Sequence, residues 1–419
     1  MTRKTYLTAQ EAARRLDIQV PTLYAYVSRG LIRSEETEGA SRARRYLAAD
    51  VEALRTRKEM RRDPAKAAES ALHFGAPVLE SAITLIENGR FYYRGHDAIT
   101  LARERPFAEV AALIWTGSLD ADWLTAVEQP ALPPVDLAGL VPIEAFQAVL
   151  PLAAARDWAA YDLSPTAVAQ TGARILKLLT AVFTNRPSNQ PTNQPTNQPT
   201  LSHAIPQRLQ QALAPQQPPA ADLFNTALIL CADHELNVSS FTARCVASAG
   251  STPYGVVGAG LAALRGPKHG GYTERVAALF QEAGTPERAA ATIASRLRRG
   301  EGIPGFGHTL YPDGDPRARE LLAQVTAVCG DNAAVALARE LETAVWQTVG
   351  QRPTVDFGLV VLARALALPP GTALGLFALG RTAGWIGHAL EQYQVDTMIR
   401  PRARYVGQAP EYPAEAPVL

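Results

Sequence analysis

The sequence predicts an all-α protein, in which a two-domain helical body follows a small winged helix-turn-helix module. Leu and Ala are abundant and only 7% of the 419 residues are aromatic, a composition that favours helices over sheets. A chain of this length is expected to form two or three domains. Charge is unevenly spread, because residues 1–62 hold 14 Lys and Arg against 8 Asp and Glu. This asymmetry indicates a basic module joined to a mildly acidic body.

The first helix is predicted to begin after Thr8, which forms a capping box with Glu11 three residues later. Pro21 suits the first position of a second helix over residues 22–29. Residues 39–45 form a basic wing tip, and Asp50 is expected to cap a third helix over residues 51–58. Helix, four-residue turn, helix and wing together make the helix-turn-helix layout.

This module resembles the small winged domains of the MerR and excisionase type. The resemblance places four residues on or near a recognition helix: Thr22, Tyr24, Tyr26 and Arg29. It also implies that three arginines meet DNA phosphates, which give position and affinity rather than sequence reading: Arg42, Arg44 and Arg45. The alternative is a protein-contact module that keeps the fold without DNA, since surface arginines are usually just solvated.

Two segments of the body are predicted to carry no chemistry. Residues 63–73 form a polar linker. Residues 186–201 contain Asn-Gln-Pro-Thr three times, starting at Asn189, Asn193 and Asn197. A proline at every fourth position forbids helix and strand interiors, so this stretch is predicted to be a disordered surface insertion.

Other global features narrow the class of protein. There is no run of eighteen apolar residues, so no membrane span is expected. Three scattered cysteines form neither a disulfide framework nor a metal-ligand pattern, and a reducing cytoplasm is the predicted location.

Two histidines stand in segments rich in glycine and proline. The first lies in Gly266-Pro267-Lys268-His269-Gly270-Gly271, and the second in Pro304-Gly305-Phe306-Gly307-His308, which continues to Asp315-Pro316-Arg317. Such composition predicts loops or helix-terminal turns, and glycine lets backbone N–H groups approach a ligand. Imidazole there can give or take a proton near neutral pH. Either histidine alone is equally well explained as a loop residue bonded to a backbone carbonyl, but the pair favours chemistry.

These two loops resemble the active-site loops of the citrate synthase family. Four more segments follow the order of that family: Ala232-Asp233-His234-Glu235-Leu236-Asn237, Val355-Asp356-Phe357, Arg381-Thr382-Ala383-Gly384-Trp385 and Ile399-Arg400-Pro401-Arg402. The resemblance covers roughly residues 74–419, and it implies an amino-terminal hairpin whose turn is Glu87-Asn88-Gly89-Arg90. It implies a large helical domain over residues 74–270 and 369–419, and a small one over residues 271–368.

The family joins acetyl-CoA to a 2-oxo acid, typically oxaloacetate, and releases CoA. The resemblance implies that Asp356 removes a methyl proton, that neutral His269 donates to the thioester oxygen, and that His308 protonates the ketone. A coenzyme A thioester is then a substrate, with no permanently bound cofactor and no metal. From its position alone, Asp356 is equally a helix N-cap residue.

The same resemblance assigns binding roles. The 2-oxo dicarboxylate is expected to contact His234, Arg317, Arg400 and Arg402, because arginine suits carboxylates. The adenine end of CoA is expected to lie against Pro304, Gly305, Phe306 and Gly307. A homodimer is also implied. The family usually places a further arginine near the carboxyl terminus, but residues 405–419 contain no Lys or Arg.

Two alternatives remain open at this stage. One is 2-methylcitrate synthesis from propionyl-CoA, because pockets discriminate one methylene weakly. The other is a DNA-binding regulator whose body senses CoA or a carboxylate. Retention of His269, His308 and Asp356 together speaks against a purely sensory body, since binding alone needs no base.

Overall fold

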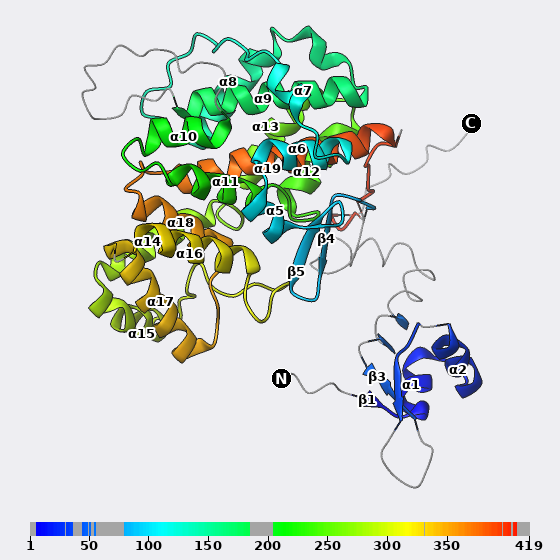
Figure 1. Ribbon diagram of the computed structural model, residues 1–419. Helices are drawn as coiled ribbons and strands as arrows, with labels where there is room; N and C mark the ends of the chain where they lie inside the picture. The colour runs from blue at the N-terminus through cyan, green and yellow to red at the C-terminus, as the bar shows by residue number, and fades with distance from the viewer. Residues whose placement is uncertain are drawn as a thin grey trace, which may run out of the picture. The chain divides into compact units, whose positions relative to one another are not determined.

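The computed structural model describes residues 6–29, 31–36, 44–48, 50–51, 54–55, 79–184, 204–330, 332–395, 397–403 and 405–408. The chain divides into two compact units, Met1–Glu80 and Ser81–Leu419 (Figure 1). Helices dominate, which confirms the predicted fold class. Arg42, the predicted linker and the Asn-Gln-Pro-Thr insertion lie outside the described residues.

The first unit packs two helices on a small antiparallel sheet of order β1-β3-β2. Its elements are β1 (Tyr6–Leu7), α1 (Ala9–Leu16), α2 (Val20–Ser28), β2 (Ser34–Glu36) and β3 (Arg44–Leu47). The capping box is confirmed, because Thr8 Oγ accepts from Glu11 N at 3.3 Å and Glu11 Oε2 accepts from Thr8 N at 2.8 Å. The first unit has its own small apolar core, which consists of Leu7, Ala12, Leu16, Leu23, Ile32, Tyr46 and Val51.

The expectation that Asp50 caps a third helix is wrong. Residue 48 already has helical backbone. The carboxylate of Asp50 instead accepts hydrogen bonds from the backbone N–H, Nε and Nη2 of Arg33, at 2.8–2.9 Å. A bidentate guanidinium is a stronger partner for a carboxylate than a helix-end N–H.

The second unit opens with a three-stranded antiparallel sheet of β4 (Thr84–Glu87), β5 (Arg90–Tyr93) and β6 (His96–Asp97). Asn88 and Gly89 join β4 to β5 with φ angles of 53° and 73°, as a tight hairpin turn requires. The predicted hairpin is therefore present at the expected place.

The rest of the second unit is helical around one large apolar core. Its α-helices are α5 (Ala98–Glu104), α6 (Phe107–Thr116), α7 (Asp122–Ala126), α8 (Pro142–Ala154), α9 (Pro165–Thr184), α10 (Ile205–Leu213), α11 (Ala220–Cys231), α12 (Val238–Ser248), α13 (Pro253–Leu264), α14 (Tyr272–Ala283), α15 (Ala289–Arg298), α16 (Pro316–Cys329), α17 (Ala333–Val349), α18 (Val355–Ala365) and α19 (Thr372–Gln394). Two 3₁₀ turns lie at Trp158–Tyr161 and Pro286–Arg288.

Helix α19 is buried along most of its length and crosses the middle of the unit (Figure 1). Glycines let it approach α11 closely. A Cβ on Gly380 would lie 2.5 Å from the backbone oxygen of Leu228, and one on Gly384 would lie 2.3 Å from that of Ala232. Only glycine fits at such distances, so this contact fixes how the end of α11 is presented.

Helices α14 to α18 gather at one end of the second unit (Figure 1). They fall within residues 271–368, where the sequence predicts the small domain, and the domain boundaries remain a prediction. Within the described part of the chain, no helix combines the length and apolarity needed to cross a bilayer.

Candidate active site

Arg317 lies in the first turn of α16, where the buried carboxylate of Asp315 holds it. Oδ1 of Asp315 accepts from the N–H of Arg317 at 3.0 Å and from its Nε at 2.9 Å, and Oδ2 accepts from Nη2 at 2.9 Å. Burial opposes the charge of the guanidinium, but the adjacent carboxylate outweighs it and raises the pKa of Arg317. This arginine therefore stays charged and fixed in direction.

His308 stands beside Arg317 at the end of the glycine-rich loop. Its Nε2 lies 3.4 Å from Nη2 of Arg317, and its Nδ1 accepts from the backbone N–H of Leu310 at 3.2 Å. Because Nδ1 accepts, the neutral ring carries its proton on Nε2. Burial, reinforced by the charge of Arg317, lowers the pKa of His308 to about 4. Two donors thus lie side by side, which suits a carbonyl or carboxylate oxygen.

His234 follows α11 and joins the same group of rings. Its Nε2 lies 2.9 Å from the hydroxyl of Tyr311, and its ring centroid is 5.5 Å from that of His308. Burial, and then the charges of Arg317 and Arg381, hold the pKa of His234 well below its usual range. A neutral imidazole is therefore expected at this position.

His269 lies in the turn between α13 and α14, with its Nε2 2.8 Å from Oγ of Ser239. Trp385 Nε1 donates to the same hydroxyl at 3.2 Å. The single proton of Ser239 can go to His269 or to Asn237 Oδ1, which already accepts two backbone N–H groups. Donation to His269 leaves the ring proton on Nδ1, free for a ligand. Burial, then the charge of Arg381, lower the pKa of His269 to about 4.

Asp356 lies in the first turn of α18, whose N-cap residue is Thr354, so the alternative that Asp356 caps the helix is wrong. Thr354 Oγ donates to Asp356 Oδ2 at 3.4 Å, and the neighbouring N–H of Val355 donates to Oδ2 of Asp315 at 3.0 Å. Burial raises the pKa of Asp356 to about 6, against the opposing charge of Arg317. Asp315 therefore contacts both Arg317, which lies beside His308, and the backbone next to Asp356, the candidate base.

Arg381 is a site residue to which the sequence analysis gave no role. It is buried in α19, donates Nε to the carbonyl of Cys231 at 2.7 Å, and lies 4.9 Å from the ring centre of Phe377. The ring of Phe377 is in turn 6.1 Å from that of His269. The signal in the sequence was an arginine inside an apolar helix, because arginine is rarely fully buried without a partner.

The loop Pro304–Gly307 is fastened by its backbone to the segment before α18. The N–H of Gly307 donates to the carbonyl of Arg352 at 2.9 Å, and the N–H of Thr354 donates to that of Gly305 at 2.8 Å. Gly305 and Gly307 have φ angles of 87° and 79°, in the region that favours glycine. The loop predicted to contact CoA therefore lies directly against the start of the helix that bears Asp356.

Arg400 and Arg402 are not brought to this cluster within the chain. Both are exposed, and the adjacent N–H of Ile399 donates to Oγ of Ser248 at the end of α12. Ser239, which contacts His269, lies at the start of that helix. Nine residues of helix separate the two ends by about 14 Å.

The predicted DNA-contacting residues that the structure describes lie on α2, at its C-cap and on β3. Thr22, Arg29, Arg44 and Arg45 are exposed, and the Tyr24 side chain is 53% exposed; Tyr26 is partly buried. Arg45 lies 3.8 Å from Glu35 and stacks over Tyr6. A groove of about 680 Å³ between α1, α2 and β3 includes Tyr24 and Arg44.

The described residues contain no group of three or more His, Cys, Asp or Glu side chains suited to a metal ion.

Within the second unit, hydrogen bonds, ring contacts and buried charges connect one cluster: His234, His269, His308, Asp315, Arg317, Asp356 and Arg381.

The chain belongs to the citrate synthase family. The family model described as citrate synthase, C-terminal domain, matches residues 71–402, and the helix-turn-helix domain model matches residues 6–59. Both resemblances drawn from the sequence are thereby confirmed.

Three similar proteins illustrate the match. Citrate synthase 2 of Bacillus subtilis is 30% identical over 355 residues, which cover 80% of this chain and 94% of the relative. The 2-methylcitrate synthase of Shewanella oneidensis is 34% identical over 191 residues, covering 45% of this chain and 51% of the relative. The crystal structure of citrate synthase from Thermotoga maritima superposes with a TM-score of 0.67 at 25% identity, covering 81% of this chain and 96% of that one.

Proposed function

We propose that this protein condenses acetyl-CoA with oxaloacetate, giving citrate and CoA. The observation that carries the proposal is the connected cluster of neutral imidazoles, two buried arginines and one carboxylate with a raised pKa. Each group has the protonation state that this reaction needs near neutral pH.

The proposed reaction uses these groups in turn. Asp356 takes a proton from the methyl group of acetyl-CoA, while Nδ1–H of His269 donates to the thioester oxygen and stabilises the enol. The enol carbon attacks the ketone carbon of oxaloacetate, and Nε2–H of His308 gives its proton to the ketone oxygen. Water then cleaves the thioester of the resulting citryl-CoA, which releases citrate and the thiol of CoA.

Binding of the dicarboxylate needs fixed positive charge. Arg317 and Arg381 supply it within one chain, and both are buried. Arg400 and Arg402 are exposed on the same chain, so we propose that they act in a homodimer by reaching the site of the other copy. Coenzyme A is proposed to lie against Pro304–Gly307, where glycines permit close backbone approach.

A thiol-release assay tests this function. Purified protein with acetyl-CoA and oxaloacetate is expected to release free thiol, and Asp356→Asn is expected to lower the rate by at least ~10³-fold because an amide cannot take up the methyl proton. The same assay with propionyl-CoA in place of acetyl-CoA tests the alternative function, which is 2-methylcitrate synthesis. Wild-type protein that releases no thiol from either acyl-CoA would sink the enzymatic proposal.

A second function, DNA binding, is proposed for the first unit, because Thr22, Tyr24 and Arg29 present an exposed polar and aromatic face on α2. A gel shift on genomic fragments is expected at low salt and should weaken steeply with added salt. The triple variant Arg42→Ala, Arg44→Ala, Arg45→Ala should lose the shift. If the wild type gives no shift at low salt, the module serves protein contacts instead.

A further inference from the structure

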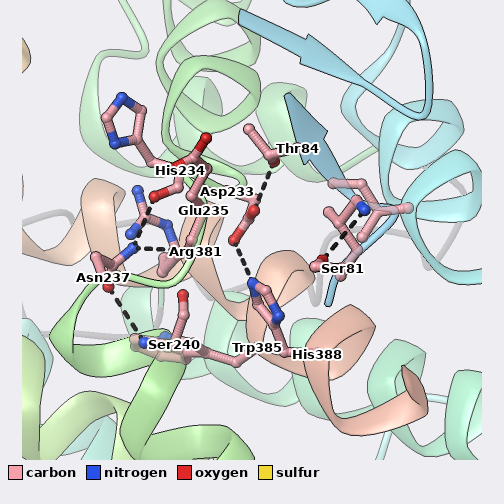
Figure 2. Close-up of polar contacts among 12 residues, drawn as sticks. Ser81, Thr84, Asp233, His234, Glu235, Asn237, Ser240, Arg381, Trp385 and His388 are labelled. Carbon is pink, nitrogen blue, oxygen red and sulfur yellow. Dashed lines mark hydrogen bonds and ion pairs between the residues drawn. The ribbon is translucent and has the colours of Figure 1, made fainter. Parts of the chain in front are cut away.

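Behind the candidate site, a buried carboxylate links three elements of the second unit. Asp233 follows α11 and is wholly buried, as is His388 on α19. Nε2 of His388 lies 3.1 Å from Oδ1 of Asp233, and Thr84 Oγ donates to Oδ2 at 2.6 Å. Figure 2 shows Asp233 between these two partners. The proposed reaction uses none of the three side chains.

The imidazole of His388 is held at one atom only. Its Nδ1 is buried and has no hydrogen-bond partner within the described residues, so the contact with Asp233 is its polar tether. The Nε2–H of His388 faces the Asp233 carboxylate and can donate to it. The imidazole therefore acts as a fixed donor to Asp233.

The same face of α19 holds the end of α11 at three successive points. Arg381 Nε donates to the carbonyl of Cys231 at 2.7 Å, the N–H of Gly384 donates to that of Ala232 at 2.9 Å, and His388 binds Asp233. Spacings of three and four residues place these groups on one side of a helix. The next residue along the chain is the site residue His234. The contacts that hold Asp233 therefore also constrain the backbone of His234.

On its other side, Asp233 is fixed by Tyr93 of β5. The one proton of the Tyr93 hydroxyl is shared between the carbonyls of Ile229 at 2.9 Å and Asp233 at 3.1 Å, and the hydroxyl accepts from the N–H of Asp233 at 3.2 Å. Burial opposes the carboxylate charge, but His388 and Arg381 outweigh it and lower the pKa of Asp233. Tyr93 and Glu235 are further titratable neighbours, and burial, followed by the charge of Asp233, raises the pKa of both.

We infer that His388 is a positioning residue, which acts through Asp233 to hold His234 and Arg381 in the orientation that binds the 2-oxo acid. This inference rests on the proposed function. Neither His388 nor Asp233 touches the ligand in this account. Their role is to set the direction of two groups that do, which differs from adding stability alone.

The test compares His388→Leu with His388→Gln. Leucine removes the donor to Asp233, whereas the glutamine amide can still donate. The leucine variant is expected to raise KM for oxaloacetate at least 10-fold with a smaller change in kcat, and glutamine is expected to recover most of that loss. His96→Leu, the same change at an exposed histidine on β6, is the matched control and should leave both constants unchanged.

A pH profile separates positioning from mere destabilisation. Loss of the His388 donor leaves the buried Asp233 carboxylate with less support, so its protonation moves upward in pH. The ratio of variant to wild-type kcat/KM is then expected to fall as the pH falls. A purely structural role would lower the melting temperature of both His388 variants and leave KM and this ratio flat.

Three further outcomes are decisive. If His388→Leu does not fold, Thr84→Val removes the other donor to Asp233 and should raise KM for oxaloacetate about 3-fold; an unchanged KM there overturns the inference. An active wild type with a folded, unimpaired His388→Leu variant also overturns it. Wild type that neither releases thiol nor binds oxaloacetate in calorimetry overturns the proposed function and this inference together.

Discussion

Asp315 shows how much one buried side chain can organise at the scale of single residues. Its two oxygens accept three hydrogen bonds from Arg317 and one from the backbone of Val355. One carboxylate therefore sets the direction of Arg317, the proposed substrate arginine, and the start of the helix that carries Asp356. The sequence showed Asp315 only as part of the Asp-Pro-Arg motif.

We expect Asp315→Asn to weaken binding of the dicarboxylate. The change keeps the side-chain volume but removes the charge that supports Arg317, and an unpaired buried arginine costs about 3–5 kcal/mol. KM for oxaloacetate should rise at least 10-fold in steady-state kinetics. Asp313→Asn, at an exposed position two residues earlier, serves as the control, and equal kinetics for the two variants would contradict the assigned role.

The raised pKa of Asp356 makes two linked predictions. Activity is expected to rise with pH through about 6, because the base must lose its proton. The folded pKa lies above the unfolded value of 3.8, so ionisation destabilises the fold as the pH rises above that value. A shift of about 2 pKa units corresponds to ~3 kcal/mol.

Asp356→Asn should therefore stabilise the protein while it removes activity. We expect up to ~3 kcal/mol more free energy of unfolding than wild type at pH 7, and almost no difference near pH 3, where Asp356 is mostly protonated in both the folded and the unfolded wild type. Urea unfolding at the two pH values measures this. A variant less stable than wild type at pH 7 would count against a strained, buried base.

At the scale of elements, the pairing of α19 with α11 carries the geometry of the site. The side chain of Arg381 donates to the carbonyl of Cys231, and the N–H of Gly384 donates to that of Ala232. The glycines of α19 leave no room between the helices. The orientation of His234 and Arg381 thus depends on a packing distance rather than on either side chain alone.

Gly384→Ala is expected to destabilise the fold by about 1–3 kcal/mol, because its Cβ would overlap backbone. Gly258→Ala in α13 is the matched control: nothing lies within 4 Å of its added Cβ, so better helix propensity should stabilise by up to ~1 kcal/mol. Thermal unfolding of both variants checks the pair. Equal shifts in melting temperature for the two variants would show that helix propensity, rather than overlap of the added Cβ with backbone, decides the effect.

Sequence patterns predicted these elements where the signal is local. The Thr8–Glu11 capping box and the Asn88–Gly89 hairpin are confirmed because their chemistry is completed within a few residues. Asp50 was assigned wrongly because its partner, Arg33, lies 17 residues away. Arg381, Asp233 and His388 gained their roles only through contacts about 150 residues apart, which no local pattern contains.

At the scale of the whole molecule, the chain combines two units with separate apolar cores. In the second unit, the ion pair of Arg103 with Glu320 and the bond from Thr226 to Gln324 join α16 to α5 and α11. These contacts cross the predicted boundary between the small and large domains. Closure of the predicted small domain onto the large domain around a ligand would exclude water during the reaction.

Deletion of residues 188–200 is expected to leave folding and activity intact. Loop-closure entropy changes slowly with length, and the helices on either side, α9 and α10, keep their own buried residues. Melting temperature and thiol release of the deletion variant measure this, against the full chain. Loss of the folded protein would show that the insertion is part of the structure.

The backbone bonds between Gly305, Gly307 and the segment 352–354 have a mechanical meaning. They join the loop proposed to hold the nucleotide end of the thioester and the first turn of α18 into a single piece of chain. Any movement of that loop when the thioester binds is therefore expected to carry the carboxylate of Asp356 with it. Binding of the thioester and alignment of the proposed base are then coupled in one movement.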